Sequence, residues 1–428
     1  MARLKVLISG GGIAGNALAF WLSKLGHKVT VVEWFPTLRA KGLQIDLRGH
    51  GIEVMKRMGL ESAFRAKAAP ENGIQVVDGS GRRRGFFAAN TSGKGLQNFT
   101  SEFEIMRGDM CRILYEAARA NKAEYVFGTS IEGFEEDKAS GGGVQVRLAN
   151  GSVDRYDLVV GADGQGSRTR RMMLGTADGA DAADGFCPLK GVYTSYFTID
   201  RQIQEGEDYI ATAYIAPGRR SMMTRRHSPE QMQVYMGFTT DSEKLKNARG
   251  DVQKEKEALA EIMKGAGWRT EEFLRDLVGS DNFYLESMGF VRLESWTRGR
   301  VVLLGDAAYC PSATTGMGTT AAMVGAYVLA GEIERHCGSV QKEHVGDGIA
   351  AALTAYEQTF RPFIDQVTKA LVDGDKNIFD AIMLTTKFGV GVLNFIVGIV
   401  SLLKFDVVAA WFLQEKVKWD LPEYKELL

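Results

Sequence analysis

Three glycines near the N-terminus have the spacing of a turn that holds phosphate groups. They are Gly10, Gly12 and Gly15, and a short apolar run precedes them. The first glycine permits a tight turn, the second lets a diphosphate approach the backbone, and the third allows close packing of a helix on a strand. The amides that open the next helix would face the phosphates. This pattern predicts a dinucleotide-binding turn; the alternative is that the glycines serve packing alone.

The residues around this turn fit a βαβ unit. We expect a strand at 4–9, a helix at 13–25 and a second strand at 28–32. Ile13 and Ala14 open the helix and are expected beside the diphosphate. Glu33 ends the second strand, where its carboxylate can accept hydrogen bonds from ribose hydroxyls and disfavours a 2′-phosphate. The tightly bound nucleotide is therefore predicted to be FAD or NAD, and not NADP.

Two later motifs also follow buried strands. The sequence Gly-Ala-Asp-Gly occupies 161–164, with Ser167 and Arg168 just beyond it, and Gly-Asp-Ala-Ala occupies 305–308. In order and spacing, the three motifs resemble those of the class A flavin monooxygenases, the p-hydroxybenzoate hydroxylase-like enzymes. The resemblance covers roughly residues 1–370. Within that group, residues 39–51 and 305–330 look most like the tetracycline-inactivating monooxygenases.

The resemblance implies a tightly but non-covalently bound FAD. Asp306 would hydrogen-bond its ribityl chain or diphosphate, and the helix beginning near Gly316 would direct its positive end at the flavin's pyrimidine edge. Arg107 and Arg39 would contact FAD, with a surface salt bridge as the alternative for each. The other positions that the family uses for FAD, or for FAD and the nicotinamide nucleotide together, are Asp163, Gly164, Gly305, Gly318 and Thr319.

Two residues depart from the family pattern beside the flavin. Ala313 stands where relatives often carry a proline, and Thr320 stands where an asparagine is common. These differences leave the shape of that loop open, and they bear less on FAD binding itself.

The activity that the resemblance implies is oxygen transfer. NADPH or NADH would reduce FAD, and O2 would form a flavin C4a-hydroperoxide whose distal oxygen passes to a phenolic or enolic aromatic or polyketide-type molecule, a tetracycline-like one included. This flavin-centred chemistry needs no catalytic side chain, which suits a chain with five histidines and no recognisable triad. The alternatives are a reductase or halogenase of the same fold, or a non-catalytic binding protein. No two tryptophans lie two residues apart, as the halogenase pattern requires.

The substrate is expected on a second, mainly antiparallel sheet, predicted by alternating aromatic segments between about 178 and 290. Tyr235 and Gly237 share one face of a strand, and by position they resemble substrate-facing residues of the tetracycline-inactivating enzymes. Arg220, or a neighbour within 219–222, could hold an acidic or enolic oxygen, and Met222 is a further substrate candidate. A structural role is the alternative at each position. Weaker candidates of the same kind are Tyr193, Tyr196 and Tyr214.

The predicted fold class is α/β, with a Rossmann-like FAD-binding domain, a mixed β-sheet substrate domain and C-terminal helices. We assign 1–75, 100–177 and 285–370 to a discontinuous FAD-binding domain, 76–99 and 178–284 to the substrate domain, and 371–428 to the C-terminal helical segment. The apolar stretch 388–403 in that segment is too short to span a bilayer. We expect it to pack across the domain junction and shield the substrate, with plain domain packing or contact with a membrane surface as the alternatives.

Composition excludes several other classes of protein. The chain has 428 residues, of which 45% are hydrophobic and 25% charged, an ordinary globular balance. Lysine and arginine total 52 against 53 acids, so we expect no nucleic-acid partner. Four scattered cysteines without a CxxC pair predict neither a metal site nor a disulfide scaffold, and they favour the cytoplasm. We expect a monomer whose partners are a small aromatic or polycyclic substrate and O2, without membrane contact.

Overall fold

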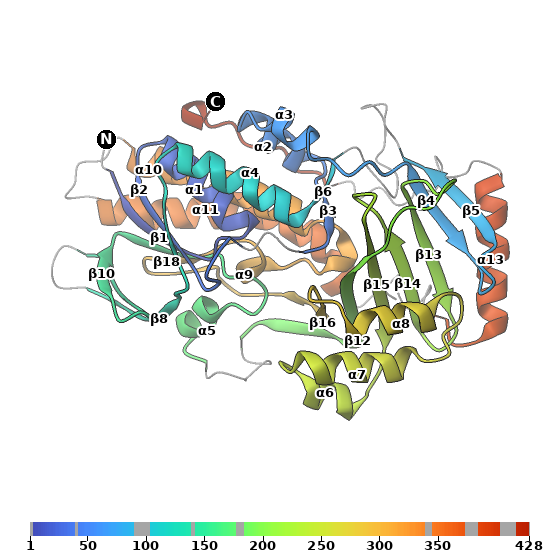
Figure 1. The fold of residues 1–428 in the computed structure, drawn as a ribbon. Coiled ribbons are helices and arrows are strands. Elements are labelled where there is room, and N and C mark those ends of the chain that lie inside the picture. The colour runs from blue at the N-terminus through green and yellow to red at the C-terminus, as the bar shows by residue number, and fades with distance from the viewer. Residues whose placement is uncertain are drawn as a thin grey trace.

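The computed structural model describes residues 3–38, 42–89, 103–137, 142–176, 184–338, 345–372, 384–402 and 417–427. Two lobes lie side by side, each built around its own large sheet (Figure 1). The first lobe contains the N-terminal βαβ unit, and the second is a mixed, mainly antiparallel sheet covered by helices. The predicted α/β fold class is therefore confirmed.

A six-stranded sheet, whose inner strands are parallel, forms the centre of the first lobe. In order across the sheet, its strands are β17 (Thr297–Arg298), β18 (Val301–Leu303), β11 (Leu158–Gly161), β1 (Lys5–Ser9), β2 (Lys28–Glu33) and β7 (Glu124–Phe127). The strands β11 and β18 are buried along their whole length. Such continuous burial is typical of parallel strands that are covered on both faces.

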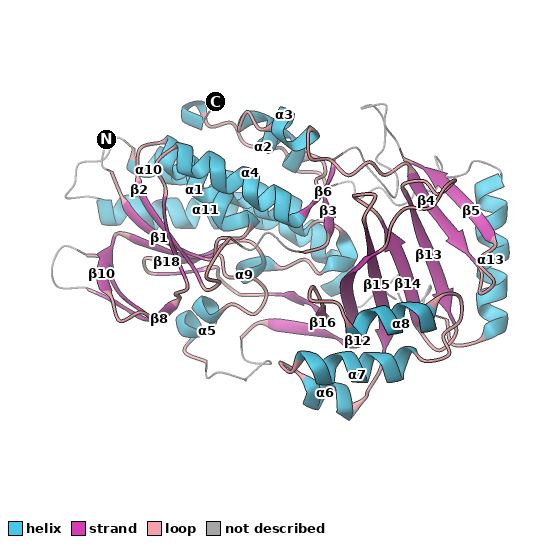
Figure 2. Ribbon diagram, viewed as in Figure 1, coloured by secondary structure: helices cyan, strands magenta, loops and turns pink. Residues whose placement is uncertain are grey.

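Helices gather on one face of this sheet, and a small sheet lies on the other (Figure 2). The helix α1 (Ile13–Lys24) packs against both α4 (Arg107–Ala120) and α10 (Gly318–Cys337), and α10 packs against α11 (Val345–Val372). The other elements of this lobe are α2 (His50–Arg57), α3 (Glu61–Arg65), α5 (Arg168–Leu174), α9 (Asp306–Tyr309), η2 (Ala313–Thr315), η4 (Lys425–Leu427), β3 (Gln44–Asp46), β6 (Glu104–Met106), β8 (Ile131–Glu136), β9 (Val144–Leu148) and β10 (Val153–Tyr156).

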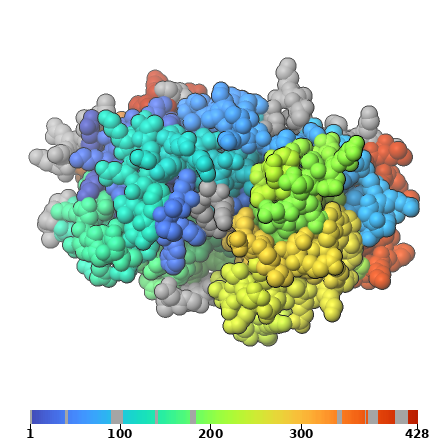
Figure 3. All heavy atoms as spheres, in the orientation of Figure 1, coloured from blue at the N-terminus to red at the C-terminus, as the bar shows by residue number. Residues whose placement is uncertain are grey.

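A seven-stranded sheet forms the second lobe. In order, its strands are β16 (Tyr284–Val291), β12 (Phe186–Asp200), β15 (Gln231–Thr239), β14 (Arg220–Arg225), β13 (Ile210–Ala216), β4 (Gly73–Val77) and β5 (Arg83–Ala88). Three helices, α6 (Glu243–Ala248), α7 (Val252–Met263) and α8 (Thr270–Val278), form the outer surface of this lobe (Figure 3). Beneath them lies a separate apolar core that includes Met236, Phe238 and Phe273.

Two strands of the second sheet extend across the predicted domain borders. The strand β4 begins at Gly73, before the border at 75, and β16 continues to Val291, beyond the border at 284. The second sheet therefore extends beyond both predicted borders. The domain limits themselves stay a prediction.

The C-terminal helix lies at the far edge of the second sheet and not at the junction of the lobes (Figure 1). This helix, α13 (Lys387–Leu402), packs along β5, where the Ser401 hydroxyl accepts from the Phe86 amide at 2.9 Å and donates to the Phe86 carbonyl at 3.1 Å. For these residues, the expectation of packing across the domain junction is wrong. The open edge of β5 has backbone groups to cover, and α13 covers part of it. Among the described helices, none is both long and apolar enough to cross a membrane.

Candidate active site

Two glycines of the N-terminal turn are required by packing within the chain. Gly10 has a φ of 108°, and a Cβ there would lie 2.5 Å from the Ala162 carbonyl oxygen. A Cβ on Gly15 would lie 2.0 Å from the Gly10 carbonyl oxygen. Both distances are far below van der Waals contact, so neither position can hold a larger residue without movement of the backbone.

The three sequence motifs meet at the N-terminus of α1. The turn at Gly10 packs against the backbone of Ala162 and Asp163 in the second motif. Gly305 of the third motif has a φ of 66°, and a Cβ there would lie 2.7 Å from the Ala14 side chain on α1. Segments from three parts of the chain therefore share one site.

Gly12 and Gly318 differ from these glycines, because packing within the chain does not require them. Neither has a positive φ. A Cβ on Gly12 would meet nothing closer than Arg107 Nη2 at 3.9 Å, and one on Gly318 nothing closer than Asp306 Oδ1 at 3.9 Å. Space that the protein itself leaves open in front of these two backbone positions is what a closely approaching nucleotide requires.

Two helix N-termini bring unpaired amides to this site. The helix α1 begins after Gly12, and α10 begins at Gly318, with Thr319 as its second residue. Neither helix has a side-chain cap or an acidic residue in its first turn. Gly316, with a φ of 65°, sets the turn before α10. The free N–H groups and the helix dipoles favour negative charge at both ends, as the diphosphate and reduced flavin of an FAD would supply.

Charged side chains complete the nucleotide site. Glu33 accepts hydrogen bonds from the Gly11 amide at 2.7 Å and the Phe35 amide at 3.0 Å, which hold its carboxylate beside the glycine turn. Asp306 is accessible, yet protein surrounds it on most sides, and this loss of hydration raises its pKa while the nearby Arg107 guanidinium opposes the rise. The glycines, helix ends and charges therefore fit FAD. Arg39 lies outside the described residues.

The Asp163 carboxylate has a role within the fold. It accepts hydrogen bonds from the Thr169 amide at 2.9 Å and the Thr169 hydroxyl at 3.0 Å, and also from the Ser167 hydroxyl. These bonds hold the N-terminus of α5. The neighbouring Gly164 has a φ of 81°, and no atom of the described residues would lie within 4 Å of a Cβ there. At this motif, the open backbone of Gly164 is better placed than the Asp163 carboxylate to meet a ligand.

The two departures from the family pattern have structural compensations. Without a proline at Ala313, the loop is held by Ser312, which has a φ of 63° and whose hydroxyl caps the turn by accepting from the Thr314 amide. The Thr320 hydroxyl accepts from the Arg48 amide at 2.9 Å and donates to the Arg48 carbonyl at 3.1 Å. Thr320 therefore ties the start of α10 to the segment that follows β3.

One face of the second sheet meets the first lobe at β3. The Tyr235 hydroxyl accepts from the Gln44 amide at 3.1 Å and donates to Gln233 Oε1 at 3.3 Å, and the Tyr196 hydroxyl donates to the Gly42 carbonyl at 2.9 Å. The two tyrosine rings contact edge to face at 5.3 Å. Gly237 lies on the same face, two residues along β15 from Tyr235, and is partly exposed.

The four predicted substrate residues do not lie together. In the pairing of β14 with β15, Met223 is opposite Tyr235 and Ser221 is opposite Gly237, so Arg220 and Met222 point to the other face. Arg220 donates to the carbonyls of Pro217, Ile262 and Lys264, and Met222 is 2% exposed in the core beneath α7 and α8. Tyr214 also lies in that core. Arg220 and Met222 therefore hold the fold on the side away from Tyr235.

Sequence reasoning missed a buried charged cluster beside Tyr235, which we call the clamp: Gln44, Glu71, Glu104 and Arg225. Arg225 donates to both carboxylate oxygens of Glu71 at 2.6 Å and pairs with Glu104. Gln44 Nε2 donates to Glu71 at 3.3 Å and to Glu104. The cluster joins β3 and β6 of the first lobe to β14 of the second. The available signal was an arginine two residues beyond Met223, on the face that Met223 shares with Tyr235.

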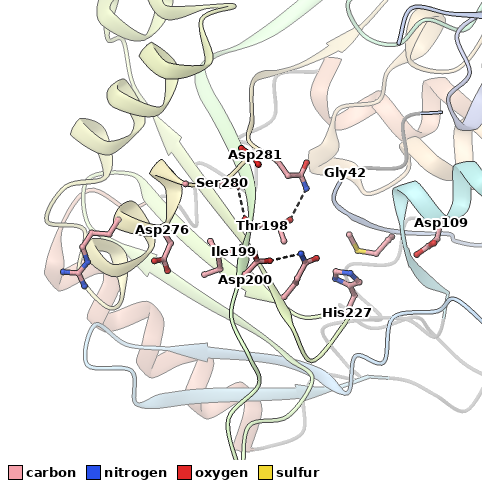
Figure 4. Close-up of a pocket in the computed structure, with 14 residues that line it drawn as sticks. Gly42, Asp109, Thr198, Ile199, Asp200, His227, Asp276, Ser280 and Asp281 are labelled. Atoms are coloured by element: carbon pink, nitrogen blue, oxygen red, sulfur yellow. Dashed lines mark hydrogen bonds between the residues drawn. The ribbon is translucent and has the colours of Figure 1, made fainter. Parts of the chain in front are cut away.

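A polar pocket of about 620 Å³ also lies between the lobes (Figure 4). Gly42 and Asp109 line it from the first lobe, Asp200 from the end of β12, His227 from the turn between β14 and β15, and Asp281 from the loop after α8. Aspartates predominate among its charged groups, which makes it a poor fit for an anionic nucleotide. Among the described residues, no cluster of His, Cys, Asp or Glu could hold a metal ion.

Asp306→Ala is expected to weaken FAD binding by about 10- to 100-fold, the value of a hydrogen bond to a charged group, while the apoprotein stays folded. Because desolvation already disfavours the Asp306 charge, its removal should not destabilise the apoprotein. Flavin absorbance of the purified variant and an FAD titration would measure the loss, with thermal unfolding as the control for folding. Wild-type FAD affinity in the variant would remove Asp306 from the site.

Comparison with known proteins shows which family shares these motifs. A family model described as an FAD binding domain matches residues 3–370. The chain is 50% identical over 438 residues to the FAD-dependent monooxygenase asL4 of Sarocladium schorii, covering 100% of both chains. It is 45% identical over 379 residues to the flavin-dependent monooxygenase eupH of Phoma sp, covering 85% of each. The solved structure of tetracycline destructase Tet(51) aligns with a TM-score of 0.74 at 26% identity, over 99% of this chain and 100% of that one.

The family model matches most of the chain. The two monooxygenases compared above also align with this chain over most of their own length. The glycine turn, the Asp306 motif and the two open helix ends lie together inside the matched region. The chain therefore belongs to the FAD-binding-domain family, and within it to the class A flavin-dependent monooxygenases.

Proposed function

We propose that this monooxygenase uses NADPH or NADH and O2 to hydroxylate a phenolic or enolic aromatic, polyketide-type small molecule, a tetracycline-like one included. The observation that carries the proposal is the face formed by Tyr196, Tyr235 and Gly237, which meets the FAD lobe at Gly42 and Gln44. Two fixed tyrosine rings beside a glycine offer an aromatic surface for a flat substrate. The resemblance to a tetracycline destructase supports a polycyclic one.

The residues of the chain bind and orient, and the bound FAD would supply the redox chemistry with the nicotinamide nucleotide and O2. Gly12, Arg107 and the N-terminus of α1 would hold its diphosphate, and the N-terminus of α10 would stabilise negative charge on its ring system. Burial raises the pKa of Tyr235, with Arg225 opposing the rise. Tyr235 therefore stays protonated and serves as a hydrogen-bonding surface for the substrate and not as a base.

The proposal is tested by NADPH and NADH oxidation in air, using FAD-loaded protein with a panel of phenols, aromatic polyketides and tetracyclines. Substrate-stimulated oxidation, together with a product that gains one oxygen atom from ¹⁸O₂, is the expected result. Oxidation without oxygen transfer would indicate a reductase, and halide-dependent product formation a halogenase. Protein that holds no flavin would indicate a non-catalytic binding protein.

Gly237→Leu is expected to raise the KM for the responding substrate by about tenfold or more, because the new side chain would project from the face that carries Tyr235 and compete with the substrate for it. FAD affinity should not change. Met222→Leu is the matched control, because Met222 lies on the opposite face of the same sheet and the swap nearly conserves volume. Equal effects of the two substitutions on KM would place the substrate elsewhere.

A further inference from the structure

The clamp joins the two lobes beside the candidate substrate face. Gln44 belongs to β3, Glu104 to β6 and Arg225 to β14. Gln44 takes part twice, because its side chain donates to both clamp carboxylates while its backbone amide donates to the Tyr235 hydroxyl at 3.1 Å. Any change in how the clamp holds Gln44 is therefore transmitted directly to Tyr235.

The clamp contains more negative than positive charge. One guanidinium, that of Arg225, faces the two carboxylates of Glu71 and Glu104, which are 7% and 1% exposed. A third acid, Asp46, lies near Glu104 and has its own partner, with its Oδ2 2.6 Å from Arg48 Nε. Burial of two carboxylates beside this guanidinium carries a desolvation cost for each of them.

This imbalance gives Glu104 an acid strength suited to neutral pH. Burial raises the pKa of Glu104 to about 7; Arg225 and Gln44 oppose the rise, and Glu71 and Asp46 add to it. Burial also raises the pKa of Asp46, against the effect of Arg48 and Arg225. The ionised Glu104 carboxylate can accept from both Arg225 and Gln44, whereas the protonated acid loses acceptor capacity.

We propose that Glu104 is a positioning residue: it holds Gln44 and, through the Gln44 backbone amide, fixes the Tyr235 ring against the substrate. Its kinetic consequence rests on the proposed function. In the ionised state both donors are satisfied and Tyr235 is fixed; in the protonated state Gln44 is held less firmly. The value of kcat/KM should therefore rise with pH near neutrality.

The pH dependence of stability has the opposite sign and needs no substrate. Because the folded protein binds the Glu104 proton more tightly than the unfolded chain does, this group's contribution to stability is complete below the unfolded pKa and is lost as pH rises through about 7. The unfolding temperature of the wild-type holoprotein should consequently fall between about pH 5 and pH 8 by more than that of Glu104→Gln.

The test compares wild type, Glu104→Gln, Glu104→Asp and Glu332→Gln as FAD-loaded proteins. Glu332 on α10 is the matched control, because it is also a buried carboxylate but lies away from Tyr235. It accepts a hydrogen bond from the Tyr424 hydroxyl at 2.7 Å. We expect Glu104→Gln to keep its FAD affinity, to lower kcat/KM about tenfold above neutrality and to lose the inflection near pH 7. Glu104→Asp should keep the inflection, and Glu332→Gln should behave as wild type.

Two results would overturn the proposal: an inflection that persists in Glu104→Gln, or one that Glu332→Gln also removes. If no substrate is turned over, the proposed function fails on its own. The positioning role of Glu104 is then tested by unfolding temperatures. In that case, a double-mutant cycle of Glu104→Gln with Tyr235→Phe should give a non-additive shift. Additive shifts would show that Glu104 does not act on Tyr235. If Glu104→Gln does not fold, Glu71→Gln replaces it in the same cycle.

Discussion

Gly12→Ala is expected to weaken FAD binding by about 10- to 100-fold, the equivalent of ~1–3 kcal/mol of overpacking, without unfolding the protein. Among the described residues, the new methyl group would meet nothing closer than Arg107 Nη2 at 3.9 Å, and the φ of −79° at Gly12 suits any residue. The cost therefore falls on the ligand, whose diphosphate must approach this backbone. An FAD titration monitored by flavin fluorescence measures it, with the thermal unfolding of the apoprotein alongside.

Gly15→Ala is the matched control in the same turn. Its methyl group would lie 2.0 Å from the Gly10 carbonyl oxygen, so the turn must move before any ligand arrives. We expect Gly15→Ala to lower the unfolding temperature of the apoprotein, and Gly12→Ala to leave it nearly unchanged. If Gly12→Ala bound FAD as wild type does, the open space at Gly12 would not be the diphosphate site.

Arg225→Met is expected to lower the free energy of unfolding by about 3–5 kcal/mol, more than any other single substitution proposed here. Methionine fills much of the arginine volume, so the loss is mainly electrostatic. Glu71 and Glu104 would remain buried without the Arg225 guanidinium, and both are almost fully enclosed. Denaturant unfolding of the holoprotein measures the free energy, provided that the transition is a single step.

The triple variant Arg225→Met with Glu71→Gln and Glu104→Gln separates charge from packing. Removal of the two buried negative charges should restore most of the lost stability, because neutral side chains carry a much smaller burial cost. A single variant that unfolds like wild type would mean that water or a proton compensates the two acids. A triple variant that remains as unstable as the single one would show that the arginine acts through packing.

Local patterns carried the prediction of the nucleotide-binding lobe. The turn at Gly10–Gly15, the strand–helix–strand order and Glu33 lie within one short stretch of chain, and their spacing constrains the backbone directly. Such features depend on neighbours in sequence, so they can be recognised before the chain is folded.

In the second sheet, local patterns predicted the face of some side chains but not of others. The period of two correctly placed Tyr235 and Gly237 on one face, but the face of Arg220 and Met222 depends on the register between β14 and β15, in which Met223 is opposite Tyr235. A shift of one residue exchanges the two faces of a strand, and nothing within β14 itself specifies that register.

The sequence by itself determined the family, the FAD turn and the two kinds of sheet, because these follow from local spacing. Only the tertiary structure decided that α13 covers β5, that Arg220 binds backbone carbonyls and that Glu104 meets Arg225 across the lobes. The residues of the Glu104–Arg225 pair are 121 positions apart, and each looks like an ordinary charged strand residue in isolation. Their burial and mutual charge exist only once the two lobes pack, and these are the properties that give the clamp its chemistry.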